Sequence, residues 1–187
     1  MVTWNELPHW RRSSLSIPLC LALMKVLKFL HDLGIIHRDI KPNNIFFSDD
    51  RRQVVIGDFG ISSVTNQKIS IRVTNGDRTI GYAAPETAQG FVMKESDYYS
   101  FGITLLHLVT GFDPFEGMTD TQILLQTINY PLNIPASVPS RLAELIRGLT
   151  VKDRNYRWGY AQVQRWCNQE VVPIYEGDTG NPGQVQY

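Results

Sequence analysis

The sequence predicts a mainly α-helical fold with one small β-hairpin, and three observations support this fold class. Apolar residues recur at helical spacing over residues 17–34 and through most of the chain after residue 97. Two short runs rich in β-forming residues, 44–47 and 54–56, flank a polar turn, which is typical of a hairpin. Residues 61–83 are polar without a period, and a loop of that length in a compact chain is usually functional or disordered.

Length and composition indicate one globular domain. The chain has 187 residues, of which 43% are hydrophobic, and can bury a sizeable core. Eighteen basic and eighteen acidic residues cancel, so the net charge does not indicate a nucleic-acid or membrane-surface partner. No apolar run reaches the roughly 20 residues that cross a bilayer, and the N-terminus lacks the basic start and apolar core of a signal peptide. We therefore expect a cytoplasmic protein with no nucleic-acid or membrane partner.

The helices are predicted from periodicity and from end signals. Ser16 is suited to cap the first helix, Pro18 fits its first turn, and Gly34 fits its C-terminal end. This helix has apolar residues on two faces, so we expect it to be largely buried. The later helices are predicted at residues 97–109, which are apolar nearly all round, and at 119–129, 139–149 and 160–168.

The chemically informative residues lie at the two ends of the hairpin. Asp39, Lys41 and Asn44 lie at its start, and Asp58 follows its second strand. Because a hairpin brings its ends together, Asp39, Asn44 and Asp58 can converge on one point. The side-chain oxygens of Asn44 and Asp58 suit Mg²⁺, which takes few protein ligands and completes its shell with phosphates and water. Asp39 is then available to accept a proton from a hydroxyl, and Lys41 can neutralise a transferring phosphoryl group.

Three motifs follow one another along the chain: His37-Arg38-Asp39 with Asn44 five residues on, Asp58-Phe59-Gly60, and Ala84-Pro85-Glu86. In this order they resemble motifs of the eukaryotic-type protein kinase family. They match the catalytic loop of that family, its metal-binding motif and the end of its activation segment. Taken singly, the Asp and Asn residues could be turn or cap residues, but as a set they favour the catalytic interpretation.

The resemblance implies a serine/threonine protein kinase that uses ATP and Mg²⁺ and acts on a protein substrate. Lys41 indicates serine/threonine substrates, because tyrosine kinases have a different catalytic-loop pattern. The resemblance also implies that Lys41, Asn44 and Asp58 contact the nucleotide, with Asn44 and Asp58 as the metal ligands. Thr79 matches the threonine that contacts the catalytic Asp39 and Lys41, and is included among the catalytic residues.

Other matching positions are implied to be structural. Asp97 resembles the residue at the start of the central helix that holds the backbone of the catalytic loop. Arg157 is expected to pair with Glu86, in preference to Arg154, because Arg157 lies four residues after Asp153 as the family pattern requires.

The resemblance is to the C-terminal lobe of the family only, with the N-terminal lobe missing. Residues 1–168 are assigned to this lobe, with the catalytic loop at 37–44 and the activation segment at 58–86, and residues 169–187 to a partly flexible tail. The sequence contains no Gly-x-Gly-x-x-Gly motif and no Val-Ala-Ile-Lys lysine. We therefore expect the isolated lobe to be inactive or very slow.

Two alternatives are open. The lobe could be a non-catalytic docking module, in which a partner or a separate N-terminal lobe covers an apolar interlobe face that also favours self-association. It could also be a small-molecule phosphotransferase of the aminoglycoside or choline kinase kind, which shares the catalytic Asp and Asn. The activation-segment motifs argue against the small-molecule phosphotransferase, because in the kinase family they build a docking surface for a protein chain.

Overall fold

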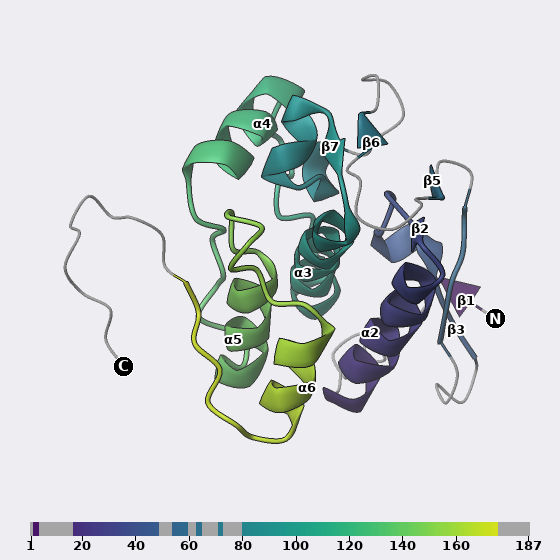
Figure 1. Ribbon diagram of the computed structural model, residues 1–187. Helices are drawn as coiled ribbons and strands as arrows, with labels where there is room; N and C mark the ends of the chain where they lie inside the picture. Colours follow the sequence, from purple (N-terminus) through teal and green to yellow (C-terminus); the bar gives the residue numbers. More distant parts are fainter. Residues whose placement is uncertain are drawn as a thin grey trace.

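The computed structural model describes residues 2–3, 17–48, 54–59, 63–64, 71–72 and 80–175. In these ranges the chain forms a helical body with a small β-hairpin at its side, as the sequence predicts (Figure 1). The helices are α2 (Ile17–Asp32), α3 (Lys94–Thr110), α4 (Asp120–Asn129), α5 (Ser140–Leu149) and α6 (Tyr160–Cys167), with short 3-10 turns η2 (Pro42–Asn44), η3 (Ile80–Tyr82) and η4 (Pro85–Gln89).

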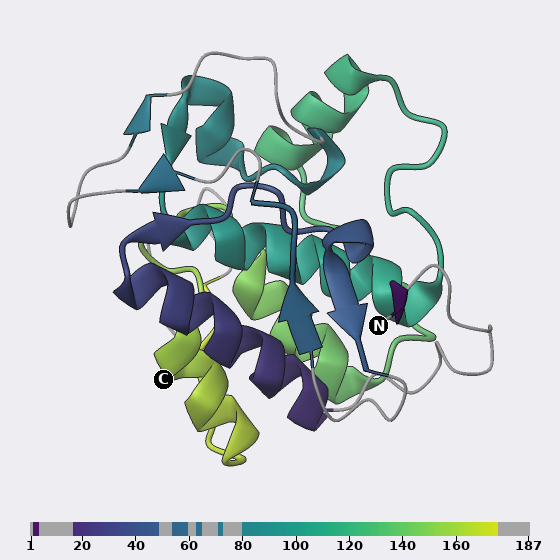
Figure 2. The same ribbon diagram turned by 90° about the vertical axis from the view of Figure 1, so that its right-hand side faces the viewer.

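Helix α3 runs through the middle of the body and is buried on nearly every side (Figure 2). It packs against α5, where Gly102 lets the backbone approach closely, because a Cβ there would lie 2.6 Å from a methyl group of Thr150. On α5 itself, Gly148 leaves space for the fully buried ring of Trp158. Helix α3 therefore has apolar residues on nearly all of its faces because it lies in the centre of the body.

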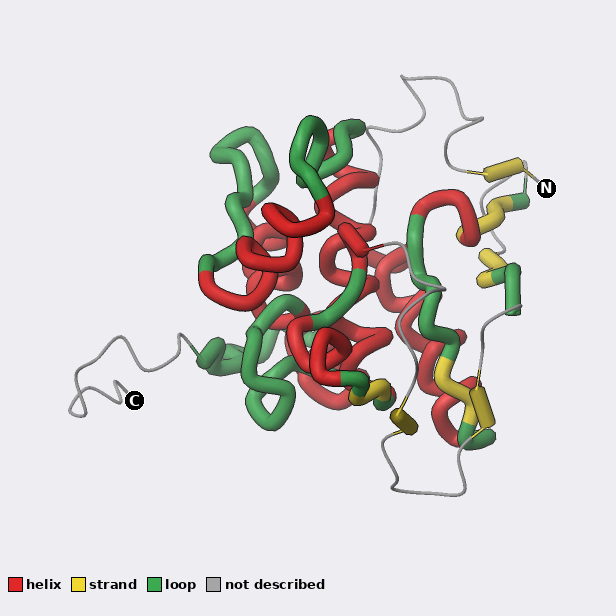
Figure 3. The backbone as a smooth tube through the Cα atoms, turned by 90° about the horizontal axis from the view of Figure 1, so that it is seen from above, coloured by secondary structure: helices red, strands yellow, loops and turns green. Residues whose placement is uncertain are grey.

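Helix α2 joins the helical body to the strands. It packs against α6 on one side and against the hairpin strand β4 on another. Its buried residues come from both predicted faces, and the helix ends at Asp32, two residues before Gly34, which has a φ of 74°. Viewed from above, helices fill most of the body and the strands lie along its edge (Figure 3).

The strands are short and antiparallel. The hairpin pairs β3 (Ile45–Phe47) with β4 (Val54–Ile56) in the register Ile45 to Ile56, and β1 (Val2–Thr3) adds to the other edge of β3. Two further pairs join segments far apart in the sequence: β2 (Ile35–Ile36) with β5 (Ser63–Val64), and β6 (Ile71–Arg72) with β7 (Phe91–Val92).

Several details differ from the sequence-based expectation. Helix α3 begins at Lys94 and not at 97, because Met93 adopts an extended conformation and its N–H is bound by the Ser96 hydroxyl. The loop 61–83 contains β5, β6 and η3. Past residue 168 the chain still packs on the body, since Val172 is buried and the carbonyl of Pro173 accepts a hydrogen bond from Trp158 Nε1 at 2.9 Å. The predicted cap at Ser16 and the end of the tail lie outside the described residues.

Among the described helices, none combines the length and the hydropathy that crossing a bilayer requires.

Candidate active site

The segment between β2 and β3 brings three of the predicted site residues into contact. Asp39 Oδ2 lies 2.7 Å from Lys41 Nζ and accepts a hydrogen bond from Asn44 Nδ2 at 2.8 Å. Asn44 Nδ2 also donates to the main-chain carbonyl of Asp39 at 2.8 Å, so the amide closes the loop on itself. The Asp39 side chain is 10% exposed and that of Lys41 is 23% exposed, so the pair is mostly buried.

Helix α3 holds this loop in place through Asp97. The Asp97 carboxylate is 1% exposed and accepts hydrogen bonds from the main-chain N–H of His37 at 2.9 Å and of Arg38 at 2.8 Å. His31 Nε2 lies 2.8 Å from the same carboxylate. A carboxylate in the first turn of a helix is also stabilised by the helix dipole. The predicted role of Asp97 is therefore confirmed.

The backbone around Arg38 and Ile40 is fixed as firmly. Arg38 has a φ of 75°, a left-handed conformation that is uncommon for a residue with a side chain and is kept here by the bond to Asp97. The Thr104 hydroxyl donates to the Ile40 carbonyl at 3.1 Å, a second link from α3. The Nε of Arg38 is buried without a hydrogen-bond partner among the described residues.

The hairpin connects Asp58 to this loop. The N–H of Gly57 donates to the Asn44 carbonyl at 2.8 Å, and His37 Nε2 lies 2.9 Å from the Gly57 carbonyl. Because His37 Nδ1 accepts the N–H of Asp39, Nε2 carries the ring proton and donates to Gly57. A Cβ at Gly57 would lie 2.7 Å from the Phe46 ring, so a larger residue does not fit.

Asp58 is exposed and has a φ of 61°. Aspartate tolerates this left-handed conformation better than most residues, which suits a side chain presented at the edge of a site. The Asn44 side-chain NH₂ donates both of its hydrogen bonds to Asp39. Its Oδ1 is therefore the side-chain atom that can bind a cation. The donor set therefore fits Mg²⁺, with one amide oxygen and one carboxylate from adjoining segments.

Thr79, the remaining predicted site residue, lies outside the described residues. The structure thus places Asp39, Lys41 and Asn44 together, with Asp58 on the adjoining segment, and the catalytic and metal-binding roles of all five residues stay predictions. Sequence reasoning did not assign the His37 side chain, which links the loop to Gly57. The signal for it was its place at the head of the His-Arg-Asp motif.

The residues that follow Thr79 form η3, which packs against α3 and α4. Tyr82 is buried in an apolar cluster with Phe115 and Ile123, and its hydroxyl lies 2.8 Å from His107 Nδ1. His107 therefore has a polar partner, as expected for a histidine on an apolar helix. Burial raises the pKa of Tyr82, and the nearby carboxylates of Asp113 and Asp39 raise it further.

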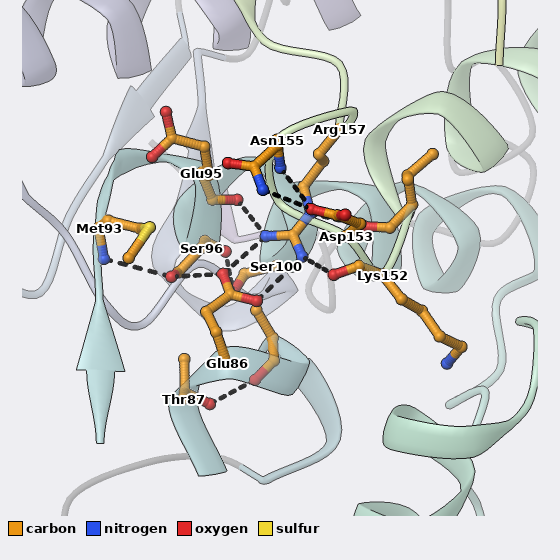
Figure 4. Close-up of polar contacts among 12 residues, drawn as sticks. Glu86, Thr87, Met93, Glu95, Ser96, Ser100, Lys152, Asp153, Asn155 and Arg157 are labelled. Atoms are coloured by element: carbon orange, nitrogen blue, oxygen red, sulfur yellow. Dashed lines mark hydrogen bonds and ion pairs between the residues drawn. The ribbon is translucent and has the colours of Figure 1, made fainter. Parts of the chain in front are cut away.

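A buried ion pair fixes the end of the activation segment to the helical body (Figure 4). Arg157, whose side chain is 0% exposed, donates to Glu86 Oε1 at 2.7 Å and Oε2 at 3.0 Å, so the predicted pair is confirmed. The same guanidinium donates to the carbonyls of Val151, Glu95 and Lys152. Burial by itself would raise the pKa of Glu86, but the hydrogen bonds and charge of Arg157 hold it below its usual value.

The comparisons with known proteins agree with this geometry. The family model for the protein kinase domain matches residues 15–167. A probable serine/threonine-protein kinase of Clostridium acetobutylicum is 36% identical over 132 residues, which are 66% of this chain and 20% of that protein. Human 3-phosphoinositide-dependent protein kinase 1 is 28% identical over 159 residues, 84% of this chain and 28% of that protein.

An Arabidopsis thaliana relative, an L-type lectin-domain containing receptor kinase, is 44% identical over 100 residues, which are 51% of this chain and 15% of that protein. The chain spans less than a third of the length of each of these three relatives.

Proposed function

The chain belongs to the protein kinase domain family, and from this premise we propose that it is the catalytic lobe of a serine/threonine protein kinase. Such a lobe transfers the γ-phosphoryl group of ATP to a hydroxyl of a protein substrate. The observation that supports this most directly is the contact of one carboxylate, Asp39, with both Lys41 Nζ and the Asn44 amide. The names of the relatives support the serine/threonine class.

Asp39 is the proposed general base. It accepts the proton of the substrate hydroxyl while that oxygen forms a bond to the γ-phosphorus and the bond to the bridging β-phosphate oxygen breaks. The Asn44 amide and the Asp97-bound backbone fix the direction of the carboxylate.

Lys41 is proposed to neutralise the charge that develops on the γ-phosphoryl oxygens, which its position beside Asp39 allows. Asn44 Oδ1 and the Asp58 carboxylate are proposed to hold Mg²⁺. When bound, this ion neutralises phosphate charge and orients the transferring group. Thr79 is proposed to support Asp39 and Lys41 from the activation segment at 58–86.

We propose that the lobe covers residues 1–168, with the catalytic loop at residues 37–44. Transfer by this chain alone is expected to be slow, because its sequence contains no glycine-rich loop to cover the phosphates. The same feature favours a second candidate, a docking module that binds proteins without turnover. Small-molecule sites usually bury at least roughly 70% of the ligand, and one wall of a cleft does not.

The test is a phosphoryl-transfer assay with labelled Mg·ATP and serine peptides, comparing the unmodified chain with Asp39→Asn. We expect the substitution to lower transfer by about 100-fold or more, the usual share of a general base. Asp32→Asn is the matched control, because that carboxylate is exposed and pairs with Lys28 on the surface of α2. Transfer by Asp39→Asn equal to that of the unmodified chain refutes Asp39 as the base.

A further inference from the structure

The two cysteines of the chain lie on the first and the last of the described helices. Cys20 is in the first turn of α2, and Cys167 is the last residue of α6. Both are free thiols in this structure. Because the sequence has only these two cysteines, any disulfide within one molecule must join them.

Helices α2 and α6 pack side by side and run in opposite directions (Figure 1 and Figure 2). One end of the pair is marked by Lys28, whose Nζ lies 5.7 Å from the centre of the Tyr160 ring at the start of α6. At about 1.5 Å per residue, α2 covers about 12 Å from Lys28 back to Cys20, and α6 covers about 10.5 Å from Tyr160 to Cys167. The two cysteines therefore lie opposite each other at the other end of the helix pair.

The side chains of both cysteines enter the same apolar core. Cys20 is fully buried in the main hydrophobic cluster, and Cys167, which is half-buried, packs against that cluster from α6. Neighbouring helices that place two thiols in one core, at matching heights, provide the geometry from which a disulfide can form by side-chain rotation.

The surroundings give the two thiols different roles. Cys167 is partly exposed, and the Arg141 guanidinium donates to the carbonyl of the adjacent Trp166 at 2.6 Å. A nearby cation favours the thiolate, which is the form that attacks a disulfide. Cys20 is closed to solvent, so its sulfur can react only with a sulfur that the protein already carries beside it.

We propose that Cys20 and Cys167 form a redox-controlled disulfide that joins α2 to α6. The oxidant is a small-molecule disulfide, such as oxidised glutathione. The Cys167 thiolate attacks one of its sulfurs, a mixed disulfide forms, and one glutathione leaves as its thiolate. Cys20 loses its proton to solvent and attacks Cys167 Sγ, and the second glutathione leaves. The protein thus loses two electrons and two protons, and oxidised glutathione gains them as two thiols.

The bond would close a loop from residue 20 to residue 167, which contains nearly all of the described helical body. Such a long closed loop restricts the unfolded chain, so the oxidised lobe should resist unfolding better than the reduced one. Burial, and to a smaller extent the proximity of Cys167, raises the pKa of Cys20 to about 12. We therefore expect oxidation over minutes to hours, as for uncatalysed thiol–disulfide exchange.

The test is incubation of the folded, full chain in reduced and in oxidised glutathione, followed by alkylation of the remaining thiols. Peptide mapping by mass spectrometry, before and after reduction, detects a peptide pair linked through Cys20 and Cys167. Urea unfolding followed by circular dichroism then compares the oxidised and the reduced chain. Cys167→Ser is the matched control, because it keeps the buried Cys20 and removes the attacking thiol. Cys20→Ala is the second variant.

We expect the linked peptides to accumulate, and the midpoint of urea unfolding to rise by about 1 M or more on oxidation. Cys167→Ser should have the same midpoint in both buffers, and Cys20→Ala should stop at the mixed disulfide of Cys167 with glutathione. Thiols that both stay free in the oxidising buffer would identify two buried cysteines that act only as small apolar side chains, and would overturn the proposal.

Three other outcomes also overturn it. The unmodified chain could stop at the mixed disulfide, or it could form only disulfides between two molecules. An oxidised chain whose midpoint is no higher than that of the reduced chain would show that the bond does not fit the folded lobe. The assay uses neither ATP nor the residues of the proposed active site, so its outcome is independent of the phosphoryl-transfer test.

Discussion

Substitution of Arg157 by alanine should lower the free energy of unfolding of this lobe substantially. The side chain is fully buried and makes two hydrogen bonds to Glu86 and three to main-chain carbonyls. In Arg157→Ala the Glu86 carboxylate, 8% exposed, loses its charged partner and keeps the hydrogen bond from the Ser96 hydroxyl at 2.8 Å. Leaving one member of a buried pair uncompensated costs about 3–5 kcal/mol. That is a large fraction of the roughly 5–15 kcal/mol that stabilises a domain.

The assay is urea unfolding followed by circular dichroism, with Arg165→Ala as the control. Arg165 bonds to Glu170 at 2.8 Å, but both side chains are about half exposed, so its loss should cost at most about 1 kcal/mol. A decrease in the free energy of unfolding that is equal for the two variants would refute the reasoning. It would mean that the buried pair contributes no more than an exposed one.

The pH dependence gives an independent check of the same pair. The pKa of Glu86 is lower in the folded state than in the unfolded chain. The stabilisation that follows is fully present above the unfolded pKa and is lost as the pH falls through the folded pKa. The difference in unfolding free energy between the unmodified chain and Arg157→Ala should therefore shrink on acidification below about pH 4. A difference that is constant from pH 7 to pH 3 would contradict the lowered pKa.

Three further outcomes follow from buried contacts. Asp97→Asn should lower the free energy of unfolding by about 2–4 kcal/mol in chemical denaturation, because the loop N–H groups and His31 lose a charged partner. Gly148→Ala should destabilise by about 1–3 kcal/mol in the same assay, since its Cβ would lie 2.2 Å from the Trp158 ring, and a stabilising effect would contradict this packing. Burial raises the pKa of Tyr98 and of Tyr99 to about 12. The free energy of unfolding should therefore decrease as the pH rises above about 10, where the tyrosines of the unfolded chain ionise. Absorbance at a tyrosinate wavelength should show these two side chains still protonated at about pH 11 in the folded protein.

The fold could be predicted where the evidence was local. Helix positions followed from apolar periodicity, and the hairpin followed from two β-rich runs around a polar turn, within a few residues of the observed bounds. The two-residue pairs β2 with β5 and β6 with β7 could not be predicted, because two residues have no period and their partners lie some 20 to 30 residues away. The addition of Val2–Thr3 to the hairpin was missed for the same reason.

The site was predictable in its residue types but not in its contacts. The spacing of Asp39, Lys41 and Asn44 predicted that they share a loop, since all three lie within six residues of the chain. The ion pair between Lys41 and Asp39 did not follow from spacing, because it depends on rotamers set by packing. Likewise no signal in the sequence connected His31 to Asp97, which meet only because α2 and α3 pack around the same loop.

The central claim is that Asn44 and Asp58 hold the metal of a nucleotide complex, and calorimetric titration with Mg·ATP tests it most directly. Asp58→Asn is the appropriate variant, because asparagine accepts the φ of 61° while removing the charge. We predict that the unmodified chain binds Mg·ATP, that Asp58→Asn binds it at least about tenfold more weakly, and that chelation of Mg²⁺ removes this difference. No binding at millimolar Mg·ATP, or equal affinity for the two proteins, would contradict the account and favour a docking module.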